Sequence, residues 1–459
     1  MENSVYLNLL LAFYFFCVSS LSHAENSIQL PLKAVNLGNW LVIEGWMKPS
    51  LFYGIPNNDL LDGTQVQFKS TMLQKYLCSE NGGGTILVAN RPIASTWETF
   101  RLWRIDESSF NFRSFGKQFV GLENQGQGNT LVAVSNDPGN SENFQIIRND
   151  EDPNRVRIRA TNGLFLQAQS ETLVTANYEG SSWDNNDPSV FEMTIVSGLQ
   201  GEYQISNGYG PEIASQDHWN TYITEEDFRF MSSNGLNAVR IPVGWWIAYD
   251  PTPPIPFVGG SLQALDNAFQ WAQNYGMKVI IDLHAVKGSQ NGNDHSATRD
   301  GYQEWGSDSD LQDTVAVIDF LTARYANNPS LAAIGLLNEP KSPGVTLETL
   351  IKYYQMGYNA VRRYTSSAYV ILCNRLGPAN SKELLPFARS LSNVVIEVHY
   401  YNLYSDSYKK MNVHQNIDFI YNQRFSDLQA ITIPAGPLSF VDAHLTKTFY
   451  VNAFLSMYS

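Results

Sequence analysis

Cysteine and charged side chains are scarce in this sequence. Among its 459 residues only 3 are cysteine and 16% are charged. Cys17 lies in an apolar N-terminal run, whereas Cys78 and Cys373 lie far apart in the sequence. So few cysteines do not imply a disulfide framework, although an oxidising compartment would permit one bond. Stability must therefore come from an apolar core, for which 43% hydrophobic residues are available.

The chain also lacks an excess of positive charge and lacks a second long apolar run. Its formal net charge is −14, which gives no basic footprint for nucleic acid or anionic lipid. Residues 5–19 are apolar and precede Ser22-His23-Ala24, which predicts a signal peptide over 1–24 and secretion to the cell wall. The missing N-terminal Lys or Arg leaves a signal anchor or a misread start codon open. No later run is long enough to span a bilayer, so no membrane contact is expected after signal cleavage.

Residues 62–197 form three similar units of short β-like runs separated by Gly, Asn, Asp and Ser. Each unit closes on a phenylalanine, at Phe100, Phe144 and Phe191. Three such units predict an inserted all-β domain, a β-trefoil. The stretch resembles the fascin-like trefoil module, which occurs as an actin-bundling unit inside cells and as a carbohydrate-associated module outside them. A packing insert without a ligand is the alternative.

From residue 198 short apolar runs alternate with amphipathic helical stretches, the pattern of a parallel α/β domain. A further predicted strand at 34–43 precedes the β-rich insert. We therefore predict a (β/α)8-type barrel whose parts are residues 25–61 and 198–441, with the insert in the loop after the first strand. The predicted barrel strands are 34–43, 236–245, 278–283, 332–337, 368–373, 394–400 and 438–441, and predicted helices include 262–275 and 311–325.

Polar side chains follow several of these runs at the end where barrel enzymes carry their active sites. Glu339 follows the apolar run 334–337, Arg240 and His284 end two other runs, and His399 with Tyr401 ends a fourth. Singly, an arginine could form a structural ion pair, and a histidine could be a satisfied core group. Four strands with polar groups at one rim favour a catalytic cleft.

These segments are similar to glycoside hydrolase family 5, in particular to plant proteins that resemble fungal exo-1,3-β-glucanases and carry a fascin-like insert. The resemblance covers nearly the whole chain after the predicted signal peptide. It rests on residues 36–44, 239–246, 282–284, 288–292, 338–340 and 399–401.

The resemblance implies a role for each matching residue in retaining hydrolysis of β-glucans. Glu339 would be the acid/base, with a raised pKa. The substrate-binding residues implied are Glu44 and His284 for the sugar nearest the cut, Asn338 for its 2-hydroxyl, Arg240 and Tyr401 for orienting the nucleophile, His399 lining the site and Tyr404 clamping the incoming sugar. Asn293 departs from the fungal partner ring of that clamp. Neither a metal nor a cofactor is implied.

The sequence departs from the family where the nucleophile glutamate is expected. Val441 is followed by Asp442-Ala443-His444, so Ala443 occupies the nucleophile position and has no carboxylate. Asp442 is one residue early, and successive side chains on a strand face opposite sides. Residues 442–459 no longer resemble the family, which predicts a barrel cut short at seven strands with unpaired edges.

Two functions remain open. One is a secreted glycoside hydrolase, or an inactive relative that lacks its nucleophile. The other is a secreted carbohydrate-binding protein that keeps the cleft without turnover. Actin bundling through the insert conflicts with the predicted signal peptide. The sequence does not fix linkage, sugar, exo or endo cutting, or oligomeric state.

Overall fold

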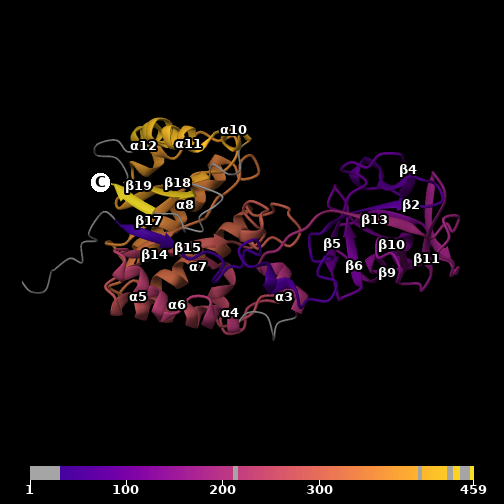
Figure 1. Cartoon of the computed structure of the whole chain (residues 1–459), viewed down its shortest axis with the longest axis horizontal. Coiled ribbons are helices and arrows are strands. Elements are labelled where there is room, and N and C mark those ends of the chain that lie inside the picture. Colours follow the sequence, from indigo (N-terminus) through magenta and orange to yellow (C-terminus); the bar gives the residue numbers. More distant parts are fainter. Residues whose placement is uncertain (1–31, 210–215, 402–405, 432–437, 445–454, 459) are drawn as a thin grey trace, which may run out of the picture.

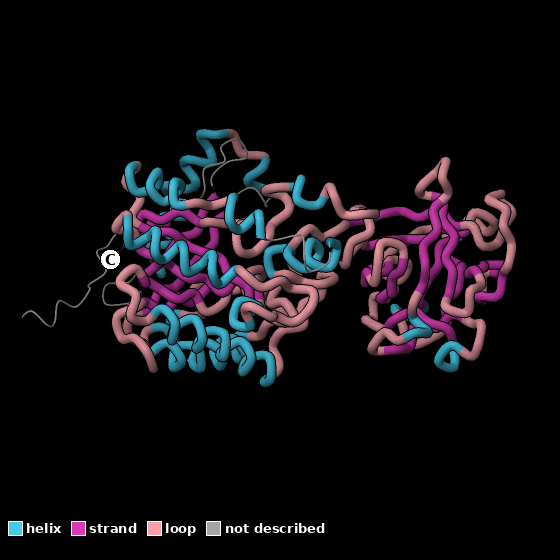
Figure 2. Tube along the Cα trace, turned by 90° about the horizontal axis from the view of Figure 1, so that it is seen from below, coloured by secondary structure: helices cyan, strands magenta, loops and turns pink. Residues whose placement is uncertain are grey.

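The computed structural model describes residues 32–209, 216–401, 406–431, 438–444 and 455–458. Two lobes lie side by side, a barrel with helices around it and a unit built almost wholly of strands (Figures 1 and 2). The predicted signal peptide, 1–24, lies outside the described residues. In the part of the chain that is described, no helix is both long and apolar enough to cross a membrane.

The barrel is a closed ring of eight strands, in the order β1, β14 to β20. Seven of them are parallel, as predicted, because each pairs in parallel with the next from β1 through β19. The strands are β1 (Lys33–Asn36), β14 (Ala238–Gly244), β15 (Lys278–Ala285), β16 (Leu331–Gly335), β17 (Tyr369–Cys373), β18 (Val394–Tyr401), β19 (Leu438–His444) and β20 (Leu455–Tyr458).

The predicted unpaired barrel edges are wrong. β20 lies between β19 and β1 and pairs antiparallel with both. A segment of the divergent tail thus supplies backbone partners that the parallel strands would otherwise lack, which removes the exposed edges. The first predicted strand, 34–43, is also shorter than expected, because β1 ends at Asn36 and Asn39 takes a left-handed conformation with φ of 58°.

The barrel strands from β14 to β17 are buried on both faces almost throughout, which explains their nearly continuous apolar sequences. Every residue of β14 and β16 is buried. The surrounding helices are α3 (Glu202–Tyr209), α4 (Gln216–Thr221), α5 (Glu225–Ser233), α6 (Ser261–Asn274), α7 (Asp308–Tyr325), α8 (Leu347–Arg362), α9 (Leu385–Ala388), α10 (Asp406–Lys409), α11 (Val413–Phe419) and α12 (Phe425–Ile431). The predicted helices 262–275 and 311–325 correspond to α6 and α7.

Helix α7 shows how local sequence and packing agree. Ser307 caps its first turn by accepting a hydrogen bond from the amide of Asp310, whose carboxylate in turn accepts from the Ser307 amide at 2.9 Å. Such a capping box satisfies amides that a helix start leaves unpaired. Leu311, Ile318 and Leu321 lie on the face that packs into the barrel core.

The second lobe consists of twelve strands between β1 and β14 in the sequence, although these two strands are neighbours in the barrel. They fall into three groups of four, as the three sequence repeats predicted. The strands are β2 (Gln65–Ser70), β3 (Tyr76–Ser79), β4 (Leu87–Arg91), β5 (Phe100–Arg104), β6 (Ser109–Arg113), β7 (Phe119–Leu122), β8 (Leu131–Ser135), β9 (Phe144–Arg148), β10 (Arg155–Ala160), β11 (Phe165–Ser170), β12 (Leu173–Tyr178) and β13 (Phe191–Ser197).

The first and fourth strands of each group pair with each other and with the next group. β2, β5, β6, β9, β10 and β13 thereby close a ring, and each group adds a hairpin. The closing phenylalanines Phe100, Phe144 and Phe191 open β5, β9 and β13 and are all at most 1% exposed. Equivalent sequence positions therefore occupy equivalent places in the core of this β unit, residues 65–197.

Candidate active site

Glu339 lies just beyond β16, at the carboxyl end of the barrel strands, and is 9% exposed. It adopts a left-handed backbone conformation, with φ of 48°. For a non-glycine residue this costs on the order of 1–3 kcal/mol, and such strain often marks functional sites. The Asn291 amide donates to the Glu339 carbonyl at 3.1 Å, which helps to hold this backbone in place.

Two histidines contact the carboxylate of Glu339, one on each oxygen. His399 Nδ1 on β18 lies 2.7 Å from Oε1, and His295 Nε2 lies 2.9 Å from Oε2. His295 belongs to η5 (Asp294–Ser296), in the loop after β15. The carboxylate is therefore held between imidazoles from two separate segments.

These contacts set the charge of Glu339. Burial raises the pKa of a carboxyl, but His295 and His399 outweigh it and hold the pKa of Glu339 well below its ordinary 4.5. Burial lowers the pKa of both histidines, and nearby negative charges outweigh it, so that both are raised above 6.5. The predicted raised pKa of Glu339 is wrong for the free site, because two imidazoles face the carboxylate.

Arg240 links three polar side chains that surround Glu339 and its histidines. It is 1% exposed and donates to Asn338 Oδ1 at 2.9 Å. The same guanidinium nitrogen, Nη2, lies 3.1 Å from carboxylate oxygens of both Asp282 and Glu397. Burial raises the pKa of Glu397, but Arg240 and then His399 outweigh it and lower it to about 2. Asn338 is thus fixed next to Glu339 by a buried charge network.

His284 ends β15 and is oriented by its own strand. Its Nδ1 lies 2.6 Å from Asp282 Oδ2, and the Gln290 amide donates to its backbone carbonyl at 2.7 Å. Gln290 also donates to the carbonyl of Asn338 at 2.8 Å. The Gln290 side chain therefore holds the backbone at the end of β15 close to the backbone that follows β16.

A family model described as cellulase, glycosyl hydrolase family 5, matches residues 204–433, which is half of the chain. This chain belongs to glycosyl hydrolase family 5. A second model, described only as a domain of unknown function, DUF7910, matches residues 57–196.

Several relatives of this family 5 chain are named glucan 1,3-beta-glucosidase. The protein from Blumeria graminis is 37% identical over 225 residues, which are 48% of this chain and 52% of the relative. A protein from Emericella nidulans, named a probable glucan 1,3-beta-glucosidase A, is 34% identical over 58% of this chain and 65% of its own length. The chain thus spans about half to two thirds of the curated relatives it matches. Among solved structures, rutinosidase from Aspergillus niger is 19% identical over 54% of this chain and 72% of that one, with a TM-score of 0.46.

Most residues predicted for the family 5 cleft lie at the carboxyl ends of the barrel strands. Arg240, His284, Asn338, Glu339 and His399 form one contact network. The Tyr401 ring lies 6.0 Å from the His399 ring. Glu44 accepts a hydrogen bond from Trp46 Nε1 at 2.9 Å, and its charge acts on His295. Tyr404 lies outside the described residues. The backbone register pairs Ala443 with Tyr400 and Asp442 with His399. Because residues in register on neighbouring strands share a face of the sheet, position 442 lies on the His399 face, which contradicts the outward position predicted for Asp442.

Sequence reasoning missed four side chains of this network. Asp282 lies in a motif of the resemblance and Glu397 in a predicted strand, but neither was given a role. His295 was not singled out, and Cys373, whose Sγ lies 3.7 Å from His399 Nε2, was considered only as a possible disulfide partner. His295 could have been found, because the sequence has only 7 histidines and this one follows the 288–292 motif closely. Its contact with Glu339 depends on the fold of the loop, which the sequence pattern alone does not show.

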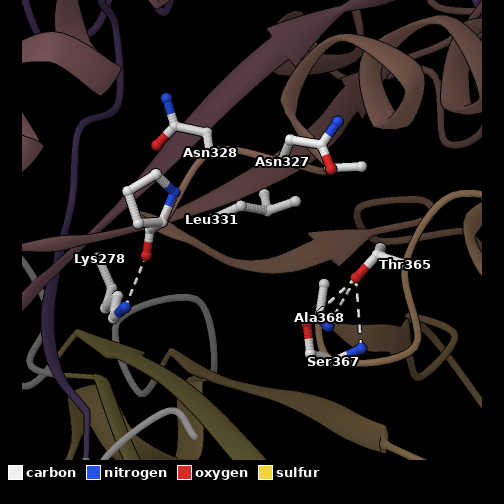
Figure 3. A pocket seen from close by; sticks show the side chains of 9 residues that line it. Lys278, Asn327, Asn328, Leu331, Thr365, Ser367 and Ala368 are labelled. Carbon is white, nitrogen blue, oxygen red and sulfur yellow. Dashed lines mark hydrogen bonds between the residues drawn. The ribbon is translucent and has the colours of Figure 1, made fainter. Parts of the chain in front are cut away.

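A pocket of about 240 Å³ lies at the opposite end of the barrel (Figure 3). Its lining includes Lys278 and Leu331, which begin β15 and β16, and Lys278 Nζ donates to the Pro329 carbonyl at 2.6 Å. Because these are the amino ends of the strands, the pocket is separate from the Glu339 network. In such barrels this face serves stability rather than catalysis.

Proposed function

We propose that the barrel accepts β-glucans or β-glucosides at the carboxyl ends of its strands, as a glucan 1,3-β-glucosidase-type hydrolase. The observation that carries this is Glu339, a buried carboxylate held at one rim together with Asn338, His284, Arg240 and His399. Glu339 stands in the place of the acid/base, and Glu44, Tyr401 and Tyr404 complete the proposed sugar-binding set.

A second function, binding of β-glucan without turnover, is favoured by two observations. Ala443 supplies no carboxylate at the nucleophile position, and retaining hydrolysis uses two carboxyl groups about 5–5.5 Å apart. The two histidines also keep Glu339 ionised near neutral pH, whereas a general acid must carry a proton. Binding requires neither property.

The experiment that separates the two functions compares four forms of the purified chain on laminarin and an aryl β-glucoside. The forms are wild type, Glu339→Gln, Ala443→Glu and, as a control, Asp442→Glu. Turnover by wild type that Glu339→Gln abolishes supports the hydrolase. Laminarin binding without turnover supports the binding protein.

The two nucleophile variants test the position assigned to the missing carboxylate. Gain of turnover in Ala443→Glu but not in Asp442→Glu supports position 443, because neighbouring residues of a strand face opposite sides. If none of the four forms binds or hydrolyses the substrates, both proposed functions are contradicted.

We propose that the β unit is a β-trefoil whose role is to hold the site loop. The closed ring of six strands with three hairpins supports this fold. Asp300 in the loop after β15 accepts hydrogen bonds from Arg113 and Trp103 of the β unit, each at 2.7 Å. The Tyr302 hydroxyl donates to the Phe115 carbonyl at 3.0 Å. The same loop carries His295, so the β unit would fix the imidazole that faces Glu339.

The remaining expectations belong to this proposal. They are domain limits of 25–61, 62–197 and 198–441, secretion to the cell wall, and a neutral glucan as the partner. Relatives named glucan 1,3-beta-glucosidase support the glucan. A fascin-like origin of the β unit stays a prediction.

A further inference from the structure

A second cluster of reactive side chains lies beside Glu339. Cys373 ends β17, and Glu397 and His399 lie on the neighbouring strand β18. His399 Nε2 is 3.7 Å from Cys373 Sγ and 3.4 Å from Glu397 Oε1, and one ligand atom from each residue lies within 4.8 Å of the other two. Cys373 and Glu397 are at most 2% exposed, and the His399 side chain is 4% exposed. The cluster is thus dry and preformed.

These separations match those of ligands around one small cation. Zinc binds sulfur at about 2.3 Å and imidazole nitrogen or carboxylate oxygen at about 2.0–2.2 Å, so tetrahedral ligands lie about 3.3–3.6 Å apart. Two of the measured separations, 3.7 and 3.4 Å, need only small adjustment. Three protein ligands would leave a fourth position for water or another group.

The orientation of His399 also fits a metal ligand. Its Nδ1 contacts Glu339 Oε1 at 2.7 Å, which leaves Nε2 directed at Cys373 and Glu397. Metal-binding histidines commonly donate their other nitrogen to a carboxylate in this way. Glu397 Oε1 is buried and lies 3.1 Å from Arg240 Nη2 and 3.4 Å from His399 Nε2, but among the described residues it accepts no hydrogen bond of good geometry.

The local charge favours a divalent cation. Arg240 is shared by the carboxylates of Asp282 and Glu397, both 3.1 Å from the same guanidinium nitrogen. The carboxylate of Glu339 faces the imidazoles of His295 and His399 instead. A dication on Nε2 would take the place of the imidazolium proton and the thiol proton, both of which leave on binding.

We propose that Cys373, Glu397 and His399 form a binding site for a thiophilic divalent cation of the zinc class. Thiolate and imidazole select zinc and its neighbours over magnesium or calcium, which prefer all-oxygen sites. This site adds to the proposed glycosidase function and does not depend on it. Its occupant would lie on the far side of the imidazole that contacts Glu339.

The test is a titration of the purified full-length protein with Co²⁺ followed by competition with Zn²⁺. Wild type is expected to bind one equivalent and to show a thiolate-to-cobalt charge-transfer band that Zn²⁺ removes. Cys373→Ser should lose the band and bind at least 10-fold more weakly. Cys78→Ser is the matched control and should behave as wild type, because Cys78 is the other buried free thiol among the described residues and lies in the β unit.

The variant Glu339→Gln tests the site while leaving the Cys373 thiol in place. Loss of the carboxylate behind His399 should weaken Co²⁺ binding by about 10-fold or more while the charge-transfer band remains. Circular dichroism shows whether each variant is folded. If Cys373→Ser does not fold, the proposal is tested by Glu397→Gln instead. A charge-transfer band in wild type that Glu397→Gln loses supports the site. Absence of the band in wild type, or unchanged affinity in folded Cys373→Ser, would overturn the site, whatever the glucan assays show.

Discussion

The contact of Asp300 with Arg113 should be a main source of stability between the two lobes. Arg113 Nη1 lies 2.7 Å from Asp300 Oδ2, and these side chains are 9% and 3% exposed. The same oxygen accepts from Trp103 Nε1 at 2.7 Å, and Oδ1 accepts from the Tyr302 amide at 3.1 Å. Asp300→Asn keeps the shape of the side chain and removes its charge.

The size of the effect follows from distance and burial. At 2.7 Å and an effective dielectric constant of about 20, opposite unit charges attract by about 6 kcal/mol before desolvation is subtracted. Removing one partner of a buried pair commonly costs about 3–5 kcal/mol, because the other charge stays buried. Glu304→Gln is the matched control, since Glu304 lies 2.9 Å from the same arginine but its side chain is 41% exposed. Solvent screening should limit its cost to about 1 kcal/mol or less.

The assay is urea unfolding monitored by tryptophan fluorescence, combined with native-state hydrogen exchange of loop 286–306. We expect Asp300→Asn to lower the unfolding midpoint and to speed exchange in the loop that carries His295. Glu304→Gln should change both only slightly. Equal effects of the two substitutions, or protected loop amides in Asp300→Asn, would refute the role of the β unit in holding this loop.

Three further substitutions probe single groups. Glu339→Gln removes the main charge that raises the pKa of His295 and one of several, after Cys373 and Glu397, that raise the pKa of His399. Both pKa values should therefore fall in an NMR titration, and unchanged values would contradict the ion pairs. Arg240→Lys removes the planar guanidinium that contacts Asn338, Asp282 and Glu397. The free energy of unfolding should fall by about 3–5 kcal/mol, measured by thermal unfolding. An unchanged midpoint would show that the protein does not need this network for stability. Burial raises the pKa of Glu202 from 4.5 to about 7. The folded state therefore holds this proton more tightly than the unfolded state does. As a result, the free energy of unfolding falls by ~3 kcal/mol as the pH rises from 4.5 through 7. Glu202→Gln should flatten that part of the pH profile of unfolding, and an unaltered slope would count against this assignment.

Much of the fold could be predicted because local pattern and final environment agree. The apolar runs 278–283 and 368–373 became β15 and β17, since strands buried on both faces need continuous apolar sequence. The repeats closing on Phe100, Phe144 and Phe191 were visible because three equivalent core positions require similar residues. The closure by β20 was not predicted, because strand pairing depends on long-range backbone contacts that a changed tail sequence does not reveal.

The candidate site was predicted in part for a similar reason. His284 and Glu339 follow apolar runs, and parallel strands bring their carboxyl ends to one rim. Arg240 instead lies inside β14, and its long side chain reaches Asn338, Asp282 and Glu397. His295 follows no strand, so its position depends on a loop clamped by the β unit. The pKa of Glu339 was predicted in the wrong direction, because that prediction followed from the implied acid/base role and did not include the two imidazoles that contact the carboxylate.

The predicted loss of the nucleophile at position 443 bears on the pKa of Glu339. In a retaining pair, the nucleophile carboxylate lies about 5–5.5 Å from the acid, and its negative charge raises the pKa of the acid. With Ala443 that charge is missing, while His295 and His399 still act on Glu339. Ala443→Glu should therefore raise the pKa of Glu339 as well as supply a nucleophile, and Asp442→Glu, at the position in register with His399, is the comparison. A carboxyl titration by NMR that shows no rise would contradict this coupling, and a rise without turnover would show that restoring the charge does not restore the geometry of attack.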